Sequence, residues 1–311
     1  MVKYKEMFED LFKEMHKVVI GQDEAIEQVL IAMMCDSNAL LEGYPGLAKT
    51  LTIKTMAQLL GMKFSRIQGT PDLMPSDITG TNIITESGGK RDFRFQPGPV
   101  FANIVLTDEI NRATPKTQSA LLEAMQEKQV TVGNETFKLD LPFFVLATQN
   151  PIEQEGTYPL PEAQADRFLL KVILGYPKED EEDKIVDRFT GEISERKLKP
   201  IISKDQFLSL QQTVRQVPIA NEVKKRAISL VLKTRTEKDL ILYGASPRAS
   251  IGLVLAAKAR AILNGRNHVL SEDIDAMSLP VLRHRIILNF EAERKGMKTD
   301  DVIKELMKKV K

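Results

Sequence analysis

The sequence predicts an α/β protein in two parts: a parallel-sheet αβα core over residues 1–175, followed by a smaller all-α domain over residues 176–311. In the first part, short apolar runs alternate with segments of helical spacing, which is typical of βαβ units whose parallel strands are covered on both faces. After Gly175-Tyr176-Pro177 the helical spacing continues and strand signals are weak. Because Gly and Pro interrupt regular structure, we expect the boundary near residue 176.

The elements of the core follow from local patterns. Gly61 is expected to end a helix over residues 51–61, because Gly favours helix C-termini. Thr114 is expected to cap a helix that begins at Pro115, since the first helical position needs no backbone N–H. A short apolar run at 38–43 and a strand-like segment at 63–69 are expected to be strands, and the apolar runs at 103–109 and 142–150 predict buried strands.

Two segments interrupt this alternation, and a helical series follows it. Residues 70–100 are rich in Gly and Pro, with charged patches, so we interpret them as an insertion. Residues 129–141 alternate around Gly133-Asn134, a pair that favours the tight turn of a β-hairpin. The second part holds segments of helical spacing at 178–189, 204–214, 220–236, 247–265, 272–286 and 300–310.

Composition limits the function classes. The 311 residues are 42% hydrophobic and 28% charged, as in a globular protein of the cytoplasm, where we expect this chain. No apolar run approaches the roughly 20 residues that span a bilayer, and the N-terminus lacks a signal-peptide core. The single cysteine, Cys35, forms no disulfide framework and is expected to be a buried thiol. No Cys/His cluster has zinc spacing, and the absence of Trp disfavours a base-stacking nucleic-acid reader.

The net charge of +1 hides an asymmetry. Residues 215–311 carry 20 basic and 11 acidic side chains, whereas residues 1–214 carry 24 basic and 32 acidic ones. The basic part could bind an anionic partner, or it could dock on the acidic part of another copy. Scattered solvated charges remain a third interpretation.

A candidate phosphate loop, GYPGLAKT, occupies residues 43–50. It follows an apolar run and precedes a helical segment, the context that the GxxxxGK[ST] motif requires. Successive backbone N–H groups and the helix N-terminus would point at phosphate oxygens. Lys49 is expected to bridge the β- and γ-phosphates and Thr50 to offer its hydroxyl to Mg²⁺, while Ala48 replaces the usual Gly with the next smallest residue. The expected nucleotide contacts are Gly43, Tyr44, Pro45, Gly46, Leu47, Ala48, Lys49, Thr50 and Leu51.

Polar side chains also end two of the expected strands. Asp108 and Glu109 follow an apolar run, and acids at a buried strand end are costly unless a cation or a chemical task compensates. Asp108 is expected to hold Mg²⁺ and Glu109 to activate the attacking water as a general base. Asn150 ends the strand at 142–150, and the carboxyl ends of parallel strands line the ligand crevice. Asn150 could therefore orient water and sense the γ-phosphate.

These motifs resemble those of the AAA+ ATPases, and more closely those of the MoxR family, over nearly the whole chain. Residues 18–32 resemble the segment that holds adenine, which implies contacts from Val19, Ile20 and Gly21. GYPGLAKT matches the family's Walker A form, in which Ala before Lys is familiar. Residues 95–132 resemble the Walker B region, residues 147–170 resemble the family's most distinctive stretch, and GASPRAS at 244–250 resembles the sensor 2 motif.

The resemblance implies further roles. Asn150 matches sensor 1, and Arg167 matches the arginine finger that reaches the γ-phosphate of a neighbouring subunit. Arg248 matches the sensor 2 arginine of the lid, and Arg112 is an alternative for the subunit interface. The insertion at 70–100 resembles the helix-2 insert and the hairpin at 129–141 the pre-sensor-1 hairpin, both of which face the pore or the substrate in this branch.

The family implies a Mg²⁺-dependent ATPase that works as a ring, by analogy a hexamer. Its ATP hydrolysis would remodel a partner protein, activate it or insert a cofactor into it. This partner could bear a von Willebrand factor A domain. Two other functions remain open. A motor or loader acting on DNA or RNA would use a basic C-terminal segment, whose charges are Arg283, Arg285, Arg294, Lys295 and Lys298. A nucleotide-gated scaffold would show little turnover.

Overall fold

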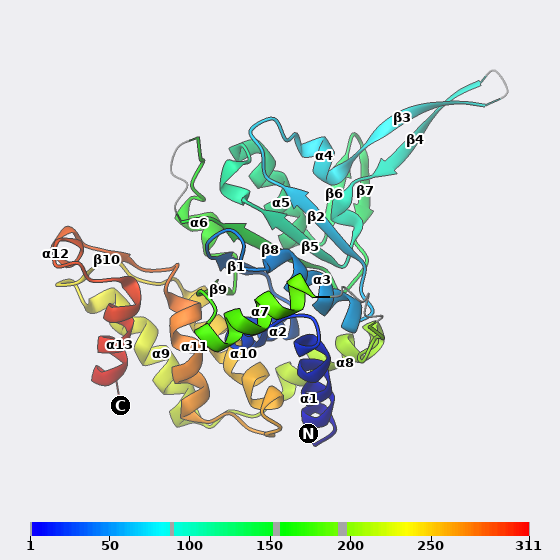
Figure 1. Ribbon diagram of the computed structural model, residues 1–311. Coiled ribbons are helices and arrows are strands. Elements are labelled where there is room, and N and C mark those ends of the chain that lie inside the picture. The colour runs from blue at the N-terminus through cyan, green and yellow to red at the C-terminus, as the bar shows by residue number, and fades with distance from the viewer. Residues whose placement is uncertain (1, 88–89, 152–155, 192–197, 311) are drawn as a thin grey trace. The chain divides into compact units, whose positions relative to one another are not determined.

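The computed structural model describes residues 2–87, 90–151, 156–191 and 198–310 (Figure 1). The chain forms two compact units. The first, which we call the helical unit, comprises Met1–Leu40, Pro161–Ile173 and Asp205–Lys311; the second, the sheet unit, comprises Leu41–Leu160 and Leu174–Lys204. The units thus interleave along the chain, and the single division expected near residue 176 stays a prediction.

A five-stranded sheet with the order β2-β5-β8-β1-β9 confirms the predicted α/β class. β2 pairs with β5 and β5 with β8, both in parallel. β5 and β8 are apolar and buried along most of their length, as expected of central parallel strands. The strands are β1 (Ala39–Glu42), β2 (Phe64–Gln68), β5 (Ile104–Asp108), β8 (Phe144–Gln149) and β9 (Leu170–Ile173). The sequence analysis did not predict β9.

The helices that the sequence predicts in the sheet unit begin and end near the expected residues, whereas the short helix at Pro75–Thr79 was not predicted. Gly61 follows α3 with a φ of +58°, a conformation in which glycine is unstrained. α5 begins at Pro115 after Thr114, which has the extended backbone of an N-cap residue. The helices here are α3 (Lys49–Leu59), α4 (Pro75–Thr79), α5 (Pro115–Glu127) and α7 (Glu179–Thr190), with short 3-10 turns at Pro99–Phe101 and Ile110–Arg112.

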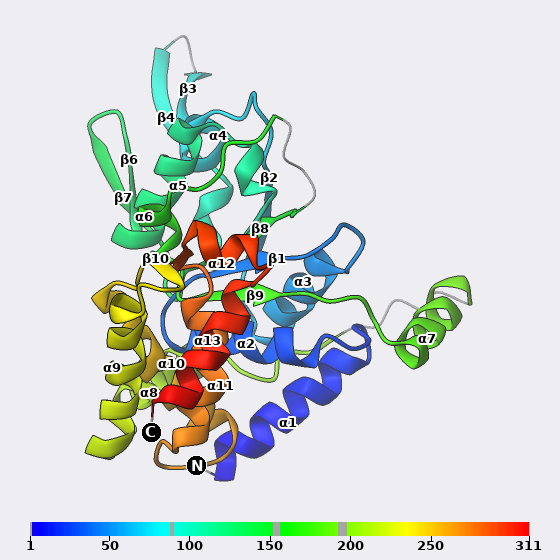
Figure 2. The same ribbon diagram turned by 90° about the vertical axis from the view of Figure 1, so that its left-hand side faces the viewer.

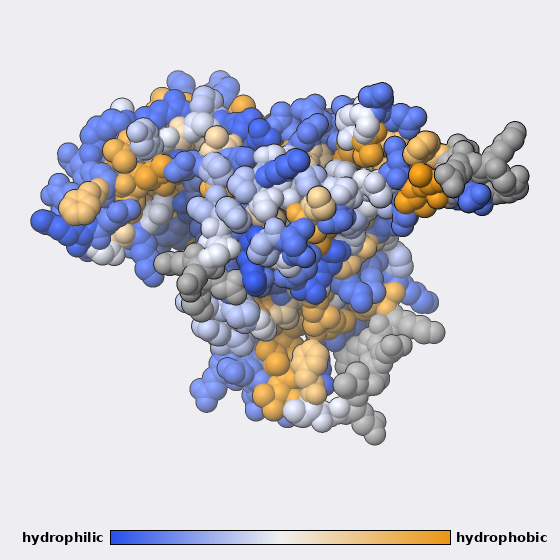
Figure 3. Space-filling model, turned by 90° about the horizontal axis from the view of Figure 1, so that it is seen from above, coloured by the Kyte–Doolittle hydropathy of each residue, from blue (hydrophilic) through white to orange (hydrophobic). Residues whose placement is uncertain are grey.

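Residues 70–100, interpreted from the sequence as an insertion, contain α4 and a pair of antiparallel strands. After α4, β3 (Gly80–Ser87) pairs antiparallel with β4 (Lys90–Pro97), and this ribbon reaches away from the sheet unit (Figure 1). Exposed apolar side chains lie on it, notably Ile84 and Phe93. Seen from above, apolar surface continues towards the end of this ribbon (Figure 3).

A second hairpin lies beside the first. β6 (Gln129–Val132) pairs antiparallel with β7 (Glu135–Lys138), and Gly133 takes a positive φ of +62° in the turn, as the Gly-Asn pair predicts. The ring of Phe95 on β4 stacks on Phe137 of β7, with centroids 4.0 Å apart. Phe101 meets both rings edge-on. This cluster joins the two hairpins at their bases.

The helical unit is organised around α10 (Pro247–Leu263). α9 and α11 contact α10, and α13 contacts α9 and α11 (Figure 2). Its neighbours approach closely: a Cβ at Gly252 would lie 2.8 Å from Leu169 Cδ1. The other elements are α1 (Val2–His16), α2 (Asp23–Met34), α6 (Glu162–Ala165), α8 (Lys204–Gln216), α9 (Asn221–Thr236), β10 (Ile241–Tyr243), α11 (Ser271–Leu282), β11 (Ile287–Leu288), α12 (Phe290–Arg294) and α13 (Thr299–Lys309).

Two further predictions concern this unit and the chain as a whole. Cys35 is buried at the end of α2, as expected for a structural thiol. Among the residues that the structure describes, no helix has both the length and the apolar character to span a bilayer.

Candidate active site

A cavity of about 430 Å³ opens at the carboxyl ends of the sheet unit's strands. It contains the predicted phosphate loop from Pro45 onward, both predicted acids and the predicted polar residue after β8, whereas Gly43 and Tyr44 are not among its lining residues. The lining residues are Pro45, Gly46, Leu47, Ala48, Lys49, Thr50, Leu51, Arg66, Asp108, Glu109 and Asn150. Residues separated by more than 100 positions therefore meet in one pocket.

The phosphate loop needs two left-handed residues. Gly46 has a φ of +84° and Ala48 a φ of +54°. An L-residue such as Ala is strained in this region by roughly 1–2 kcal/mol, which explains why the general motif prefers Gly before Lys. Gly43 serves a different need, because a Cβ there would lie 2.9 Å from Leu174 Cβ. The backbone therefore curls so that α3 begins at Lys49, whose Nζ donates to Gly43 O at 2.8 Å.

Asp108 and Thr50, the two predicted Mg²⁺ residues, lie next to each other. Thr50 Oγ1 donates to Asp108 Oδ2 over 3.5 Å. Thr148 Oγ1 donates to the other carboxylate oxygen, Oδ1, at 2.7 Å. Arg66 donates to Oδ2 through Nε at 3.1 Å and through Nη2 at 2.6 Å. The carboxylate is thus oriented from both sides.

Glu109 lies at the end of β5 in the left-handed region, with a φ of +54°. Its backbone N–H donates to Thr148 Oγ1 at 2.9 Å. Its Oε2 accepts from Gln68 Nε2 at 3.0 Å and from Arg112 Nη1 at 3.2 Å. The carboxylate is therefore held by its own chain, and Arg112, predicted as a candidate for the interface, contacts it.

The sequence did not identify Arg66, Gln68 or Thr148 as site residues. Arg66 and Gln68 lie on the same face of β2, since side chains alternate along a strand. Their polar character at the carboxyl end of a strand was the available signal. That signal could not be read without the strand order, because β2 reaches Asp108 only by pairing with β5.

The remaining predicted residues divide between the two units. Asn150 is nearly buried and lines the cavity, and residues 152–155 after it lie outside the described part of the chain. Val19, Ile20 and Gly21, between α1 and α2, belong to the helical unit. Their contacts with adenine stay a prediction.

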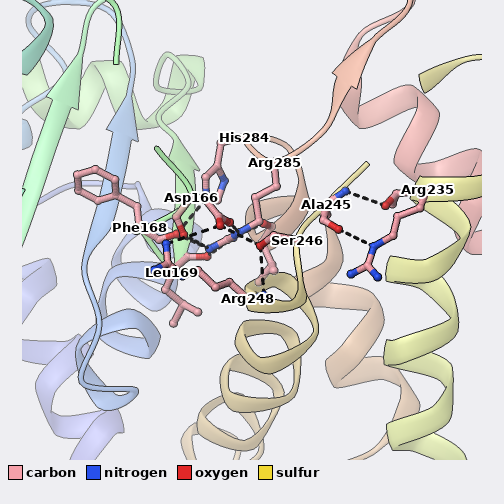
Figure 4. Close-up of polar contacts among 11 residues, drawn as sticks. Asp166, Phe168, Leu169, Arg235, Ala245, Ser246, Arg248, His284 and Arg285 are labelled. Atoms are coloured by element: carbon pink, nitrogen blue, oxygen red, sulfur yellow. Dashed lines mark hydrogen bonds and ion pairs between the residues drawn. The ribbon is translucent and has the colours of Figure 1, made fainter. Parts of the chain in front are cut away.

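Arg167 and Arg248 also belong to the helical unit, and Figure 4 shows Arg248 near Asp166. Arg167 follows α6 and is exposed. Arg248 is in the first turn of α10, with its Nη1 3.8 Å from Asp166 Oδ2. Their contacts with phosphate also stay predictions.

Comparison with known proteins agrees with this geometry. Residues 38–170 match the model of the ATPase family associated with various cellular activities (AAA), and residues 232–306 match an AAA lid domain. The first range contains the whole cavity, and the second contains Arg248 and Arg285. Nucleotide binding follows from this fold.

The matched relatives extend over nearly the full chain. Chaperone MoxR1 of Mycobacterium tuberculosis is 42% identical over 96% of this chain and 80% of its own length. The uncharacterized protein YeaC of Bacillus subtilis is 43% identical, with 96% and 92% covered. A crystal structure from Cytophaga hutchinsonii, described as a candidate ATPase, has a TM-score of 0.93 and 46% identity, with 100% and 96% covered. The resemblance drawn from the motifs is thus confirmed, and the chain belongs to the MoxR family of AAA+ ATPases.

Proposed function

We propose that this protein is a Mg²⁺-dependent ATPase that converts ATP to ADP and phosphate within a ring of its own copies. One observation carries the proposal: the phosphate loop, Asp108, Glu109 and Asn150 line a single cavity. Such a pocket brings together the hydrogen-bond donors for the phosphates, a carboxylate for Mg²⁺ and a general base, which phosphoryl transfer to water needs.

The donors around Thr50 and Asp108 fit Mg²⁺. A hydroxyl and a carboxylate, 3.5 Å apart, are the hard oxygen ligands that this ion prefers. Mg²⁺ held by these residues would supply positive charge that stabilises the phosphate oxygens. Lys49 and the backbone N–H groups of the loop complement the same charge, so the chain binds the triphosphate through several independent contacts.

Glu109 is the proposed general base. Gln68 and Arg112 hold its Oε2, which leaves Oε1 to accept a proton from the attacking water. Asn150 lies across the same cavity and is proposed to orient that water. Positioning of this kind is the main contribution that a protein makes to phosphoryl transfer.

Arg167 is proposed to act on the nucleotide of a neighbouring copy in a hexameric ring. Its side chain is exposed, and none of the described residues forms an ion pair with it. An arginine supplied by a neighbour raises hydrolysis rates by about 10³–10⁵. Arg248 is proposed to contact the phosphates bound by its own chain. The acidic part of the sequence, residues 1–214, and the basic part, residues 215–311, are suited to dock copies on each other.

ATP hydrolysis is proposed to drive the remodelling or activation of a partner protein, or the insertion of a cofactor into it. The relative from M. tuberculosis is named a chaperone. Ile84 and Phe93 expose 62% and 74% of their surface on the ribbon β3–β4, and apolar side chains held out on a hairpin are suited to grip a partner chain. A partner with a von Willebrand factor A domain is proposed from the family resemblance.

The structure weakens the support for a nucleic-acid motor. Arg283 forms a two-pronged pair with Asp300, and Arg285 is buried against Asp166. These two charges therefore pair within the chain. Of the basic C-terminal segment that a nucleic-acid motor would use, only Arg294, Lys295 and Lys298 are then left to contact a phosphate backbone.

Glu109→Gln tests the ATPase. The variant should bind ATP as tightly as the wild type while its turnover falls by at least about 10², because binding contacts remain and the base is lost. Binding is measured with a fluorescent ATP analogue and turnover by phosphate release. Glu123→Gln, an exposed change on α5, is the matched control and should leave both unchanged. Equal turnover in the Glu109→Gln variant and the wild type would contradict the proposal.

Dilution tests the ring. Turnover per subunit should fall as the assembly dissociates, and the particle mass is followed by mass photometry.

A scaffold with little turnover would instead bind partners in a nucleotide-dependent way while releasing almost no phosphate. Capture of interactors by the Glu109→Gln variant, in ATP and in ADP, then identifies the partner.

A further inference from the structure

Arg285 is a buried arginine that none of the nucleotide-binding motifs contains. It lies between α11 and β11, and its side chain is only 3% exposed. Burial lowers the pKa of its guanidinium, and the hydrogen bond and charge of Asp166 oppose that shift. A buried arginine is costly unless its charge is paired and its donors are satisfied. Both conditions hold here.

All five N–H donors of this guanidinium have acceptors. Nε donates to Asp166 Oδ1 at 2.8 Å. Nη2 donates to Asp166 O at 3.2 Å and to Phe168 O at 2.5 Å, and Nη1 donates to Leu169 O at 2.9 Å and to Val281 O. Three of the four carbonyl groups therefore belong to residues 166, 168 and 169.

Figure 4 shows Arg285 among Asp166, Phe168 and Leu169, which in sequence come before and after Arg167. Arg285 thus holds the backbone just before and just after Arg167, while the Arg167 side chain itself is exposed. His284 also holds this backbone segment, because its Nε2 lies within hydrogen-bond distance, 3.0 Å, of Phe168 O. The segment is short and α6 before it has only four residues, so it has little regular structure of its own to fix the backbone.

Asp166 connects Arg285 to Arg248, the predicted sensor 2 arginine. Its Oδ1 faces Arg285, and its Oδ2 accepts from Ser246 Oγ at 2.8 Å. Ser246 caps α10, and its Oγ accepts from the backbone N–H of Arg248 at 3.2 Å. Arg248 Nη1 lies 3.8 Å from the same Oδ2. One carboxylate therefore joins the segments that bear Arg167 and Arg248.

We propose that Arg285, with Asp166 as its counter-charge, is the positioning residue that holds Arg167 ready to complete the ATP site of a neighbouring copy. The inference rests on the proposed function, in which Arg167 acts in trans. Through Ser246, the same contacts link that arginine to Arg248, which serves the chain's own nucleotide. Each copy thus carries a direct physical connection between two ATP sites.

Arg285→Lys is the main test. Lys keeps the charge but offers three donors from a single point, so it cannot bond the carbonyl groups on both sides of Arg167. A displacement of about 1 Å at such a group costs roughly 10² in rate. We therefore expect kcat to fall by about that factor while the KM for ATP changes less than about threefold, since the binding pocket is intact.

Mixed assemblies distinguish positioning from a merely structural role. Arg285→Lys subunits have an intact base, and Glu109→Gln subunits have an intact Arg167, so mixing the two inactive variants should restore turnover. Mixing Arg285→Lys with Arg167→Ala should restore none, because both lack a placed arginine. Arg283→Lys is the matched control: it lies two residues away, pairs with Asp300 and should keep turnover within twofold.

The outcomes separate this proposal from the one on which it depends. If Arg167→Ala with Glu109→Gln restores turnover but Arg285→Lys with Glu109→Gln does not, the positioning role is wrong and the trans site stands. If neither mixture restores turnover, the trans site itself is wrong, and this inference is overturned with it. Should Arg285→Lys fail to assemble, Asp166→Asn, which retains an acceptor for Nε, takes its place with the same expectations.

Discussion

Arg66 and Asp108 form an ion pair across adjacent parallel strands, with Arg66 Nη2 2.6 Å from Asp108 Oδ2. Asp108 Oδ2 also accepts a hydrogen bond from Thr50 Oγ1 over 3.5 Å. The guanidinium therefore occupies the carboxylate oxygen that is proposed to face Mg²⁺. Two cations cannot share that oxygen without mutual repulsion.

Arg66→Met should lower the Mg²⁺ concentration needed for half-maximal ATP binding. The Arg66 side chain is 49% exposed, and exposed ion pairs contribute only up to about 1 kcal/mol, so the expected shift is about fivefold or less. Titrating Mg²⁺ against a fluorescent ATP analogue in the Glu109→Gln background measures it without turnover. An increased Mg²⁺ requirement would show that Arg66 helps to bind the nucleotide instead of competing with the ion.

Gln68→Ala should reduce turnover and leave ATP binding unchanged. Gln68 Nε2 donates to Glu109 Oε2 at 3.0 Å, and the loss of a hydrogen bond that orients a charged group costs about 1.5 kcal/mol, or roughly tenfold in rate. Steady-state kinetics should place the whole effect in kcat. Gln126→Ala is the matched control, because Gln126 is exposed on α5 and donates to Glu127. A rise in KM with constant kcat would contradict the role given to Gln68.

Ala48→Gly and Ala48→Val should differ sharply in stability. Gly removes the strain at a φ of +54° but increases the entropy of the unfolded chain, so the free energy of unfolding should change by no more than about 1 kcal/mol. A β-branched Val in the same conformation should cost about 1–3 kcal/mol. Urea unfolding measures both. Equal stability of the two variants would mean that this residue does not keep its left-handed conformation.

His284 should make the protein less stable in mild acid. Burial is the main cause that lowers its pKa well below the usual value, and the nearby Arg285 adds to the shift. The folded state therefore keeps the imidazole neutral while the unfolded state binds a proton below a pH of about 6.5. Stability should be full above that pH and fall below it, by up to about 1.4 kcal/mol per pH unit for this group.

The His284→Gln variant isolates that contribution. Its free energy of unfolding, measured between pH 7.5 and 5.5, should depend less on pH than that of the wild type. The two slopes should differ by at most the slope for one bound proton, about 1.4 kcal/mol per pH unit. His268→Gln is the control, because His268 is exposed. Identical slopes for His284→Gln and the wild type would show that His284 is not the responsible group.

The sequence by itself determined the parts of the site that lie close together along the chain. The spacing of Gly43, Gly46, Lys49 and Thr50 depends on one turn before one helix, so local geometry is enough to predict it. The acids after an apolar strand also stood out locally, because two carboxylates at the end of a buried strand are costly unless a cation or a chemical task compensates. The fold class followed from the alternation of strand and helix patterns.

Only the tertiary structure decided which distant side chains hold those parts. Arg66 reaches Asp108 because β2 pairs with β5, and strand order is not encoded in any local pattern. In the sequence Arg285 was one charge of a basic C-terminal segment that could meet nucleic acid, yet it is buried against Asp166, 119 positions away. Hydrogen bonds of this kind depend on the directions and distances that packing imposes, and periodicity and composition contain neither.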